Sequence, residues 1–85
     1  MTHYIKILEQ YADAILEGRK NFEVRLNDRG YNAGDRVVFK VIDDYNIANA
    51  HHDLCKKSFV ITYVHSGLGM QNGYVVFGIK ECGTH

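Results

Sequence analysis

The stretch GRKNFEVRL, residues 18–26, decides the fold because the periodicity of the chain changes within it. Gly18, followed by two cations, is typical of the end of a helix, where glycine adopts the terminating conformation and cations face the negative end of the helix dipole. From residue 22 onward, apolar and polar side chains alternate with a period of two, which predicts a half-buried strand. The predicted apolar face holds Phe22, Val24 and Leu26, and the polar face displays Glu23, Arg25 and Asn27.

The residues before this stretch predict a strand followed by a short helix. Tyr4 to Leu8 form a β-compatible run that is too short to be a helix on its own. From Glu9 the apolar residues recur at spacings of three and four, which is the pattern of a helix with one buried stripe. That stripe holds Leu8, Ala12, Ile15 and Leu16, with Tyr11 beside it.

Three further strands are predicted after residue 26. The turn-forming residues 32–35 lead into an apolar run over Val37–Ile42, and two more runs cover Phe59–His65 and Tyr74–Lys80, with a glycine-rich loop at residues 66–73 between them. In the first of these two runs, one face is expected to hold Phe59, Ile61 and Tyr63. Strand, helix and four strands predict a small α+β fold whose sheet of about five strands curls into a β-barrel.

Length and composition limit the function classes. The chain has 85 residues, which predicts one domain over residues 1–85. Ten Lys and Arg balance ten Asp and Glu, so binding to nucleic acid through bulk positive charge is excluded. Two cysteines make no disulfide framework, and neither a leader pattern nor an apolar run long enough for a membrane is seen, so we expect a cytoplasmic protein.

Charge is concentrated locally despite this neutrality. Residues 18–29 hold four cations against two carboxylates, a net charge of +2. Glu23 and Arg25, two positions apart on one strand face, can orient each other and leave the guanidinium and Lys20 to meet a phosphate or carboxylate. The alternative is a solvated strand face with an ordinary ion pair.

The spacing Gly18-x-Lys20-x-x-Glu23-x-Arg25 resembles the signature of ASCH domains, a branch of the PUA-like superfamily. The similarity extends to the opening strand, the helix, Gly34-Asp35 and residues 73–79, and it is greatest with a small bacterial and phage ASCH-like family of unknown function. The resemblance implies a PUA-like β-barrel with the signature lining a cleft between barrel and helix. It also implies binding of RNA, a nucleotide or a modified nucleoside.

The ligand residues expected under this resemblance are Lys20, Glu23 and Arg25, with Arg29 guiding a nucleic-acid backbone. Gly67 and Gly69 are expected at the rim, where small residues let a ligand approach the main chain. Stacking on a base is a further possibility for three tyrosines, for which core or edge packing is the alternative. These are Tyr31, Tyr45 and Tyr74.

One branch of the ASCH domains is an amidohydrolase, which removes the acyl group from acetylated cytidine with a lysine, a threonine and a distant glutamate. Lys20 matches the lysine, but Glu23 stands where the threonine would be, so the hydroxyl nucleophile is missing. An amidohydrolase that acts on acylated nucleosides such as acetylcytidine, with Lys20 and Glu23 as an acid–base pair, is therefore the second hypothesis after binding.

Residues 43–57 show no periodicity and predict either a mobile excursion or a site. They include His51, His52 and Cys55, which are fewer ligands than the four or so of a structural zinc site, so we expect no metal and no cofactor. A third hypothesis assigns this loop to the binding of a host or partner protein.

Overall fold

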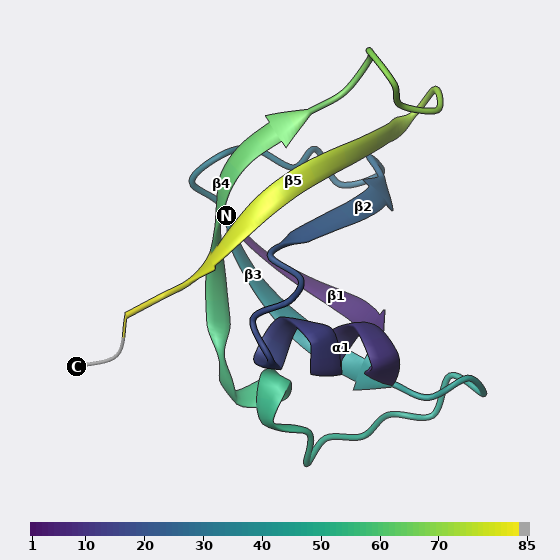
Figure 1. Cartoon of the computed structure of the whole chain (residues 1–85), viewed down its shortest axis with the longest axis vertical. Helices are drawn as coiled ribbons and strands as arrows, with labels where there is room; N and C mark the ends of the chain where they lie inside the picture. The colour runs from purple at the N-terminus through teal and green to yellow at the C-terminus, as the bar shows by residue number, and fades with distance from the viewer. Residues whose placement is uncertain (84–85) are drawn as a thin grey trace.

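The computed structural model describes residues 1–83, and Thr84 and His85, the last residues of the predicted domain, lie outside it. Within residues 1–83, five strands and two helical segments follow one another along the chain (Figure 1). They are β1 (Thr2–Leu8), α1 (Glu9–Leu16), β2 (Phe22–Leu26), β3 (Arg36–Ile42), the 3₁₀ helix η1 (Asp53–Lys56), β4 (Ser58–His65) and β5 (Tyr74–Glu81). The predicted order of strand, helix and four strands is confirmed, and the strand boundaries differ by at most two residues.

All five strands belong to one sheet, in the order β1-β3-β4-β5-β2. β1 runs parallel to β3, and the other neighbours are antiparallel. The sheet curls into a half-barrel, so its two edge strands, β1 and β2, come to lie on the same side of the molecule (Figure 1). This confirms the α+β class and the small curled five-strand sheet with one α-helix after the first strand.

The core fills the concave side of the half-barrel. It is built from alternating apolar residues of β1, β3, β4 and β5, joined by α1, which packs on β1 and β3. On α1 the buried residues are Ala12, Ala14 and Ile15. Leu16, predicted on the buried stripe, is exposed because the helix ends there, and it lines a shallow surface pocket beside Lys56 and Lys57.

A β-bulge changes the predicted alternation of β4. The register with β5 shifts between Ile61 and Tyr63, so the face that each later residue occupies is reversed. Tyr63, expected beside Ile61, is 69% exposed, and Val64 packs against the core instead. The opposing Gly78 leaves room for this bulge, because a Cβ placed there would lie 2.6 Å from the Thr62 hydroxyl.

Burial on β2 is the reverse of the predicted burial. Its apolar residues Phe22, Val24 and Leu26 are 43%, 52% and 51% exposed, whereas Glu23 is only 4% exposed. The physical reason is the place of β2 in the sheet: its inner face looks into the opening between the two edge strands, and the core ends at β5. A pattern of period two identifies a strand but does not say which face is inside.

The segment at residues 43–57 is tied to the fold at several points. Ala48 pairs with Ile42 in an isolated β-bridge, and Leu54 of η1 is completely buried in the core. His52 bonds through Nε2 to Asp13 of α1 at 2.8 Å. The predicted irregular loop is thus an ordered flap that covers one end of the core.

No helix in residues 1–83 combines the length and the apolar character that a membrane span needs.

Candidate functional site

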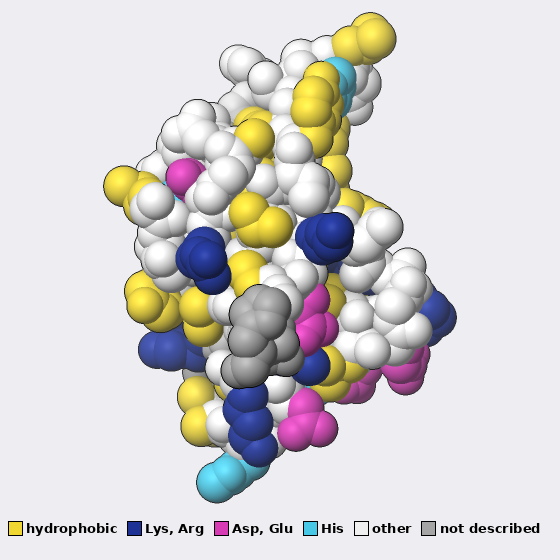
Figure 2. All heavy atoms as spheres, turned by 90° about the vertical axis from the view of Figure 1, so that its left-hand side faces the viewer, with side chains coloured by type: hydrophobic (Ala, Val, Ile, Leu, Met, Phe, Trp, Pro, Cys, Tyr) yellow, Lys and Arg dark blue, Asp and Glu magenta, His cyan; other side chains and the backbone are white. Residues whose placement is uncertain are grey.

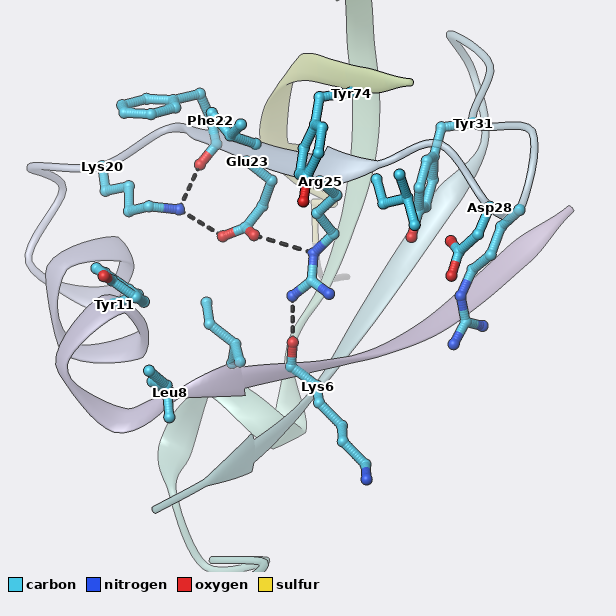
Figure 3. Close-up of a pocket in the computed structure, with 14 residues that line it drawn as sticks. Lys6, Leu8, Tyr11, Lys20, Phe22, Glu23, Arg25, Asp28, Tyr31 and Tyr74 are labelled. Carbon is cyan, nitrogen blue, oxygen red and sulfur yellow. Dashed lines mark hydrogen bonds and ion pairs between the residues drawn. The ribbon is translucent and has the colours of Figure 1, made fainter. Parts of the chain in front are cut away.

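A cleft of about 650 Å³ opens between the edge strands β1 and β2 (Figure 3). α1 closes one end of it, and the loop that follows β2 closes the other. Its lining comes from β1, α1, the helix-to-strand junction, β2, the 28–31 loop and the start of β5. These residues are Lys6, Ile7, Leu8, Tyr11, Lys20, Phe22, Glu23, Val24, Arg25, Leu26, Asp28, Arg29, Tyr31 and Tyr74.

The Glu23 carboxylate lies at the centre of the cleft between two cations (Figure 3). Its Oε1 accepts a hydrogen bond from Lys20 Nζ, and its Oε2 accepts one from Arg25 Nε at 3.1 Å. Lys20 Nζ also donates to the carbonyl of Phe22 at 2.6 Å. A carboxylate with only 6% of its side chain exposed is tolerable here because each of its oxygens is paired with a positive charge.

Arg25 joins the two edges of the open sheet. While its Nε bonds to Glu23 on its own strand, its Nη2 donates to the backbone carbonyl of Lys6 on β1. The Lys6 side chain turns away and donates to Asn46 at 3.2 Å, so Lys6 offers its main chain to the cleft and not its charge. The three motif residues therefore converge on a concave cleft, and their ion-paired strand face is largely covered, not solvated.

The charges that remain in the cleft favour an anion. Apart from Lys6, whose ammonium group donates to Asn46, the lining holds three cations, Lys20, Arg25 and Arg29, against Glu23 and Asp28, an excess of one positive charge. On the face that Figure 2 presents, by contrast, Lys and Arg side chains are spread among acidic and apolar ones. A small concave basic site in a neutral protein suits a compact anionic ligand better than a long polyanion.

Aromatic rings form part of the wall. Tyr11, Phe22 and Tyr74 are 45%, 43% and 37% exposed and line the cleft. Lys20 Nζ lies 5.0 Å from the centroid of the Phe22 ring and 5.7 Å from that of Tyr11, distances typical of cation–π contacts. The sequence pattern did not identify Phe22 and Tyr11 as site residues. It predicted Phe22 on the buried face of the strand, and it placed Tyr11 beside the buried stripe of the helix.

The three tyrosines proposed for stacking have different surroundings. Tyr74 lines the cleft. Tyr31 also borders it, but this residue is 4% exposed, its ring packs 4.7 Å from His3 and 4.9 Å from Phe77, and burial raises the pKa of its hydroxyl. Tyr45 is 85% exposed on the 43–57 segment and is not among the lining residues. Only Tyr74 therefore has both the position and the accessible ring that stacking requires.

The glycine-rich loop lies beside the cleft and not in it. Gly67 lines a second pocket of about 510 Å³, together with Asn27 and the 70–75 segment, and Tyr74 borders both pockets. Gly69 lines neither pocket. Arg29, by contrast, lines the cleft as expected. The structure thus brings together four of the six predicted ligand residues, and a role for the two glycines remains a prediction.

Two of the three potential metal ligands of the 43–57 segment, His52 and Cys55, have other partners. His52 bonds to Asp13 and accepts from the backbone of Leu54, and Cys55 donates to the carbonyl of Asn49. Over the part of the chain that the structure describes, no three His, Cys, Asp or Glu residues are grouped so that they could hold a metal ion.

Comparison with known proteins gives a family and a fold. Residues 2–79 match the sequence model of a family described as a domain of unknown function, DUF3850. An uncharacterized 12.9 kDa protein in the GpA 3′ region of Escherichia phage P2 is 42% identical over 36 residues, which are 42% of this chain and 33% of that protein. The chain thus spans about a third of the length of this relative. The crystal structure of the hypothetical protein PH0355 has the same fold, with a TM-score of 0.63, 16% identity, and coverage of 96% of this chain and 100% of the other.

Proposed function

We propose that this chain, which belongs to the DUF3850 family, binds a nucleotide or modified nucleoside, free or within RNA, in the cleft between β1 and β2. The observation that carries the proposal is the convergence of Lys20, Glu23 and Arg25 on one concave site. The resemblance of residues 18–25 to the ASCH signature supports it, because proteins of the PUA-like superfamily are known for binding RNA or modified bases.

The dimensions and chemistry of the cleft agree with such a ligand. Its volume falls within the range of roughly 300–1,000 Å³ that is common for small-molecule sites. Lys20 and Arg25 each offer a charged N–H donor to an oxygen atom of the ligand, and Arg29 at the rim adds a cation for its phosphate. Tyr74, Tyr11 and Phe22 offer the aromatic surface on which a base can stack.

Hydrolysis of acylated nucleosides is the second candidate, and the contact of Lys20 with Glu23 favours it. The acyl-enzyme route through a serine or threonine hydroxyl has no candidate, however, because the residues that line the cleft include neither. Incubation of the protein with N4-acetylcytidine at high protein concentration, followed by mass spectrometry, tests this candidate. Release of cytidine that is lost in Lys20→Ala would favour hydrolysis over binding alone.

We also propose a cytoplasmic location. Cys55 and Cys82 are both free thiols, which supports a reducing compartment.

Isothermal titration calorimetry with the four ribonucleoside 5′-monophosphates and short single-stranded RNAs tests the binding proposal. Loss of a charge-assisted hydrogen bond is expected to weaken binding about tenfold or more in Lys20→Ala and in Arg25→Lys, which keeps the charge but loses the fork. Arg19→Ala is the matched control, because Arg19 neighbours Lys20 but pairs with Glu17 on the surface. Failure of the wild type to bind any of these ligands, or equal binding by all variants, overturns the proposal.

A further inference from the structure

The charged groups of the cleft form a row with a fixed order. Lys20 Nζ, the two oxygens of Glu23 and the guanidinium of Arg25 follow one another below β2 (Figure 3). From one end to the other, the row presents a donor, an acceptor and a donor. All three side chains face the space between β1 and β2. The exposed fractions of the Lys20, Glu23 and Arg25 side chains are 16%, 6% and 23%.

Each member of the row has hydrogen-bonding capacity left for a ligand. The ammonium of Lys20 has three N–H groups and uses two, on Phe22 and Glu23. Arg25 uses Nε and Nη2, and its Nη1 makes no hydrogen bond within residues 1–83. Each oxygen of Glu23 accepts one hydrogen bond and can accept another. The cleft therefore offers a donor, a charged acceptor and a donor.

The existing bonds hold this row in place. Arg25 is held at one end by Lys6 on β1 and at the other by Glu23, and Lys20 is held by Phe22 and Glu23. Glu23 itself is among the few buried charged residues of the described chain. A preorganised row selects its ligand, because an unmatched partner leaves a desolvated polar group without a hydrogen bond.

The complement of this row is an acceptor, a donor and an acceptor. Among the common nucleobases, only uracil and thymine carry that order on the Watson–Crick edge, as the two carbonyls and the N3–H of an imide. Cytosine would turn its amino group toward a cation and its N3 lone pair toward the Glu23 carboxylate. Adenine fails at all three positions, because it has an amino group, the N1 lone pair and a C2–H there, and guanine presents a second donor in place of the second carbonyl.

We propose that the cleft selects an imide edge, C(=O)–N(H)–C(=O), and so takes uracil or thymine ligands in preference to cytosine and the common purines. This inference rests on the proposed nucleotide-binding function and names the base that it takes. Glu23 acts as the acceptor of the imide N–H, and Lys20 and Arg25 donate to the two carbonyls. Tyr74, whose ring is accessible at the wall, is the stacking surface.

Calorimetric titration with a matched series of 5′-monophosphates tests this selectivity. Uridine and 3-methyluridine monophosphates differ only at the imide proton, and cytidine monophosphate differs only in the order of its groups. A mismatch at a buried hydrogen bond is expected to weaken binding of the last two about tenfold or more. Thymidine and xanthosine monophosphates, which keep the imide, distinguish a pyrimidine-specific site from a general imide site.

The variant Glu23→Gln, which replaces the carboxylate by a neutral amide, gives a second readout. Its amide can turn either an oxygen or an amino group to the ligand, so the preference for uridine over cytidine monophosphate is expected to fall toward one. Equal binding of uridine, 3-methyluridine and cytidine monophosphates, with loss in Lys20→Ala, would overturn the base selectivity and leave the proposed function standing. Absence of binding to every nucleotide would overturn both.

Discussion

Glu23 on β2 and Phe77 on β5 stand directly opposite each other in the sheet. Residues that oppose each other in an antiparallel pair point to the same face, so the carboxylate shares the inner face with a core phenylalanine that is 1% exposed. Arg25 and Val75 are related in the same way. The sheet thus continues its inner face from apolar residues on β5 to charged residues on β2, and this change is what creates a polar cleft beside the core.

Removal of the Glu23 carboxylate is expected to destabilise the fold. In Glu23→Ala, Lys20 and Arg25 lose their common partner while they remain largely covered, which should lower the free energy of unfolding by about 1–3 kcal/mol. Chemical denaturation measures this loss. Glu17→Ala breaks the surface pair with Arg19 and should change stability by less than about 0.5 kcal/mol. Equal effects in the two variants would mean that the cleft pairs contribute no more than a surface ion pair.

A side chain at Gly78 is expected to collide with the β4 bulge. In Gly78→Ala the new Cβ meets the Thr62 hydroxyl at 2.6 Å, so the Thr62 side chain or the strands must shift, at a cost of about 1–3 kcal/mol. Thr62→Ala removes that oxygen, and the double variant should regain most of the lost stability. A thermal melt of the two single variants and the double variant measures the rescue. A double variant no more stable than Gly78→Ala would show that the contact is not the cause.

The flap at residues 43–57 is expected to depend on one buried side chain. Leu54 is completely buried, and Leu54→Ala leaves a cavity beneath η1, which should cost about 2–4 kcal/mol. Tyr45 belongs to the same segment but is 85% exposed, so Tyr45→Ala should change stability by less than about 0.5 kcal/mol. If denaturation gave Leu54→Ala a wild-type midpoint, the flap would not be part of the cooperative core.

Asp35 is expected to contribute stability that is lost in acid. The hydrogen bond from His3 at 2.9 Å, helped by the backbone N–H of Asn32, holds the pKa of Asp35 below its usual value of 3.8. Since the folded-state pKa is depressed, this contribution is present above 3.8 and disappears as the pH falls through the folded-state pKa.

Unfolding of the wild type and Asp35→Asn at a series of acidic pH values measures that contribution. The difference between the two proteins should shrink as the pH falls below 3.8, the usual value for aspartate. A difference that stays constant through this range would contradict the assignment. Carbon NMR of the Asp35 carboxyl group provides a direct check, because its titration midpoint should lie below that usual value.

Periodicity was enough to predict the elements of this fold, but not which way they face. The alternation in residues 22–26 identifies β2 in full, yet the strand exposes Val24 and buries Glu23 because it lies at the open edge of the sheet. Strand order depends on long-range pairing, which periodicity does not contain. The same holds for the exposure of Tyr63, since the bulge before it belongs to the pairing of β4 with β5, where Gly78 leaves room for it.

The site was predictable to the extent that it is local in sequence. Lys20, Glu23 and Arg25 lie within six positions, and their spacing brought them together as a candidate. The parts that come from far along the chain, such as the Lys6 carbonyl on β1 and the Tyr11 ring on α1, needed the folded structure. Gly67 was expected at the rim from the resemblance to ASCH domains, and the structure instead places it at the neighbouring pocket.

The central claim is that the cleft between β1 and β2 is the ligand site, and a two-dimensional NMR titration of the isotope-labelled protein with uridine 5′-monophosphate tests it most directly. We predict saturable shifts of the backbone amides of residues 20–26, Lys6 and Tyr74, with the 43–57 segment unchanged. The same titration of Lys20→Ala should show much weaker shifts. Shifts confined to the 43–57 segment or to residues 66–70, or no saturable shift at all, would contradict the account.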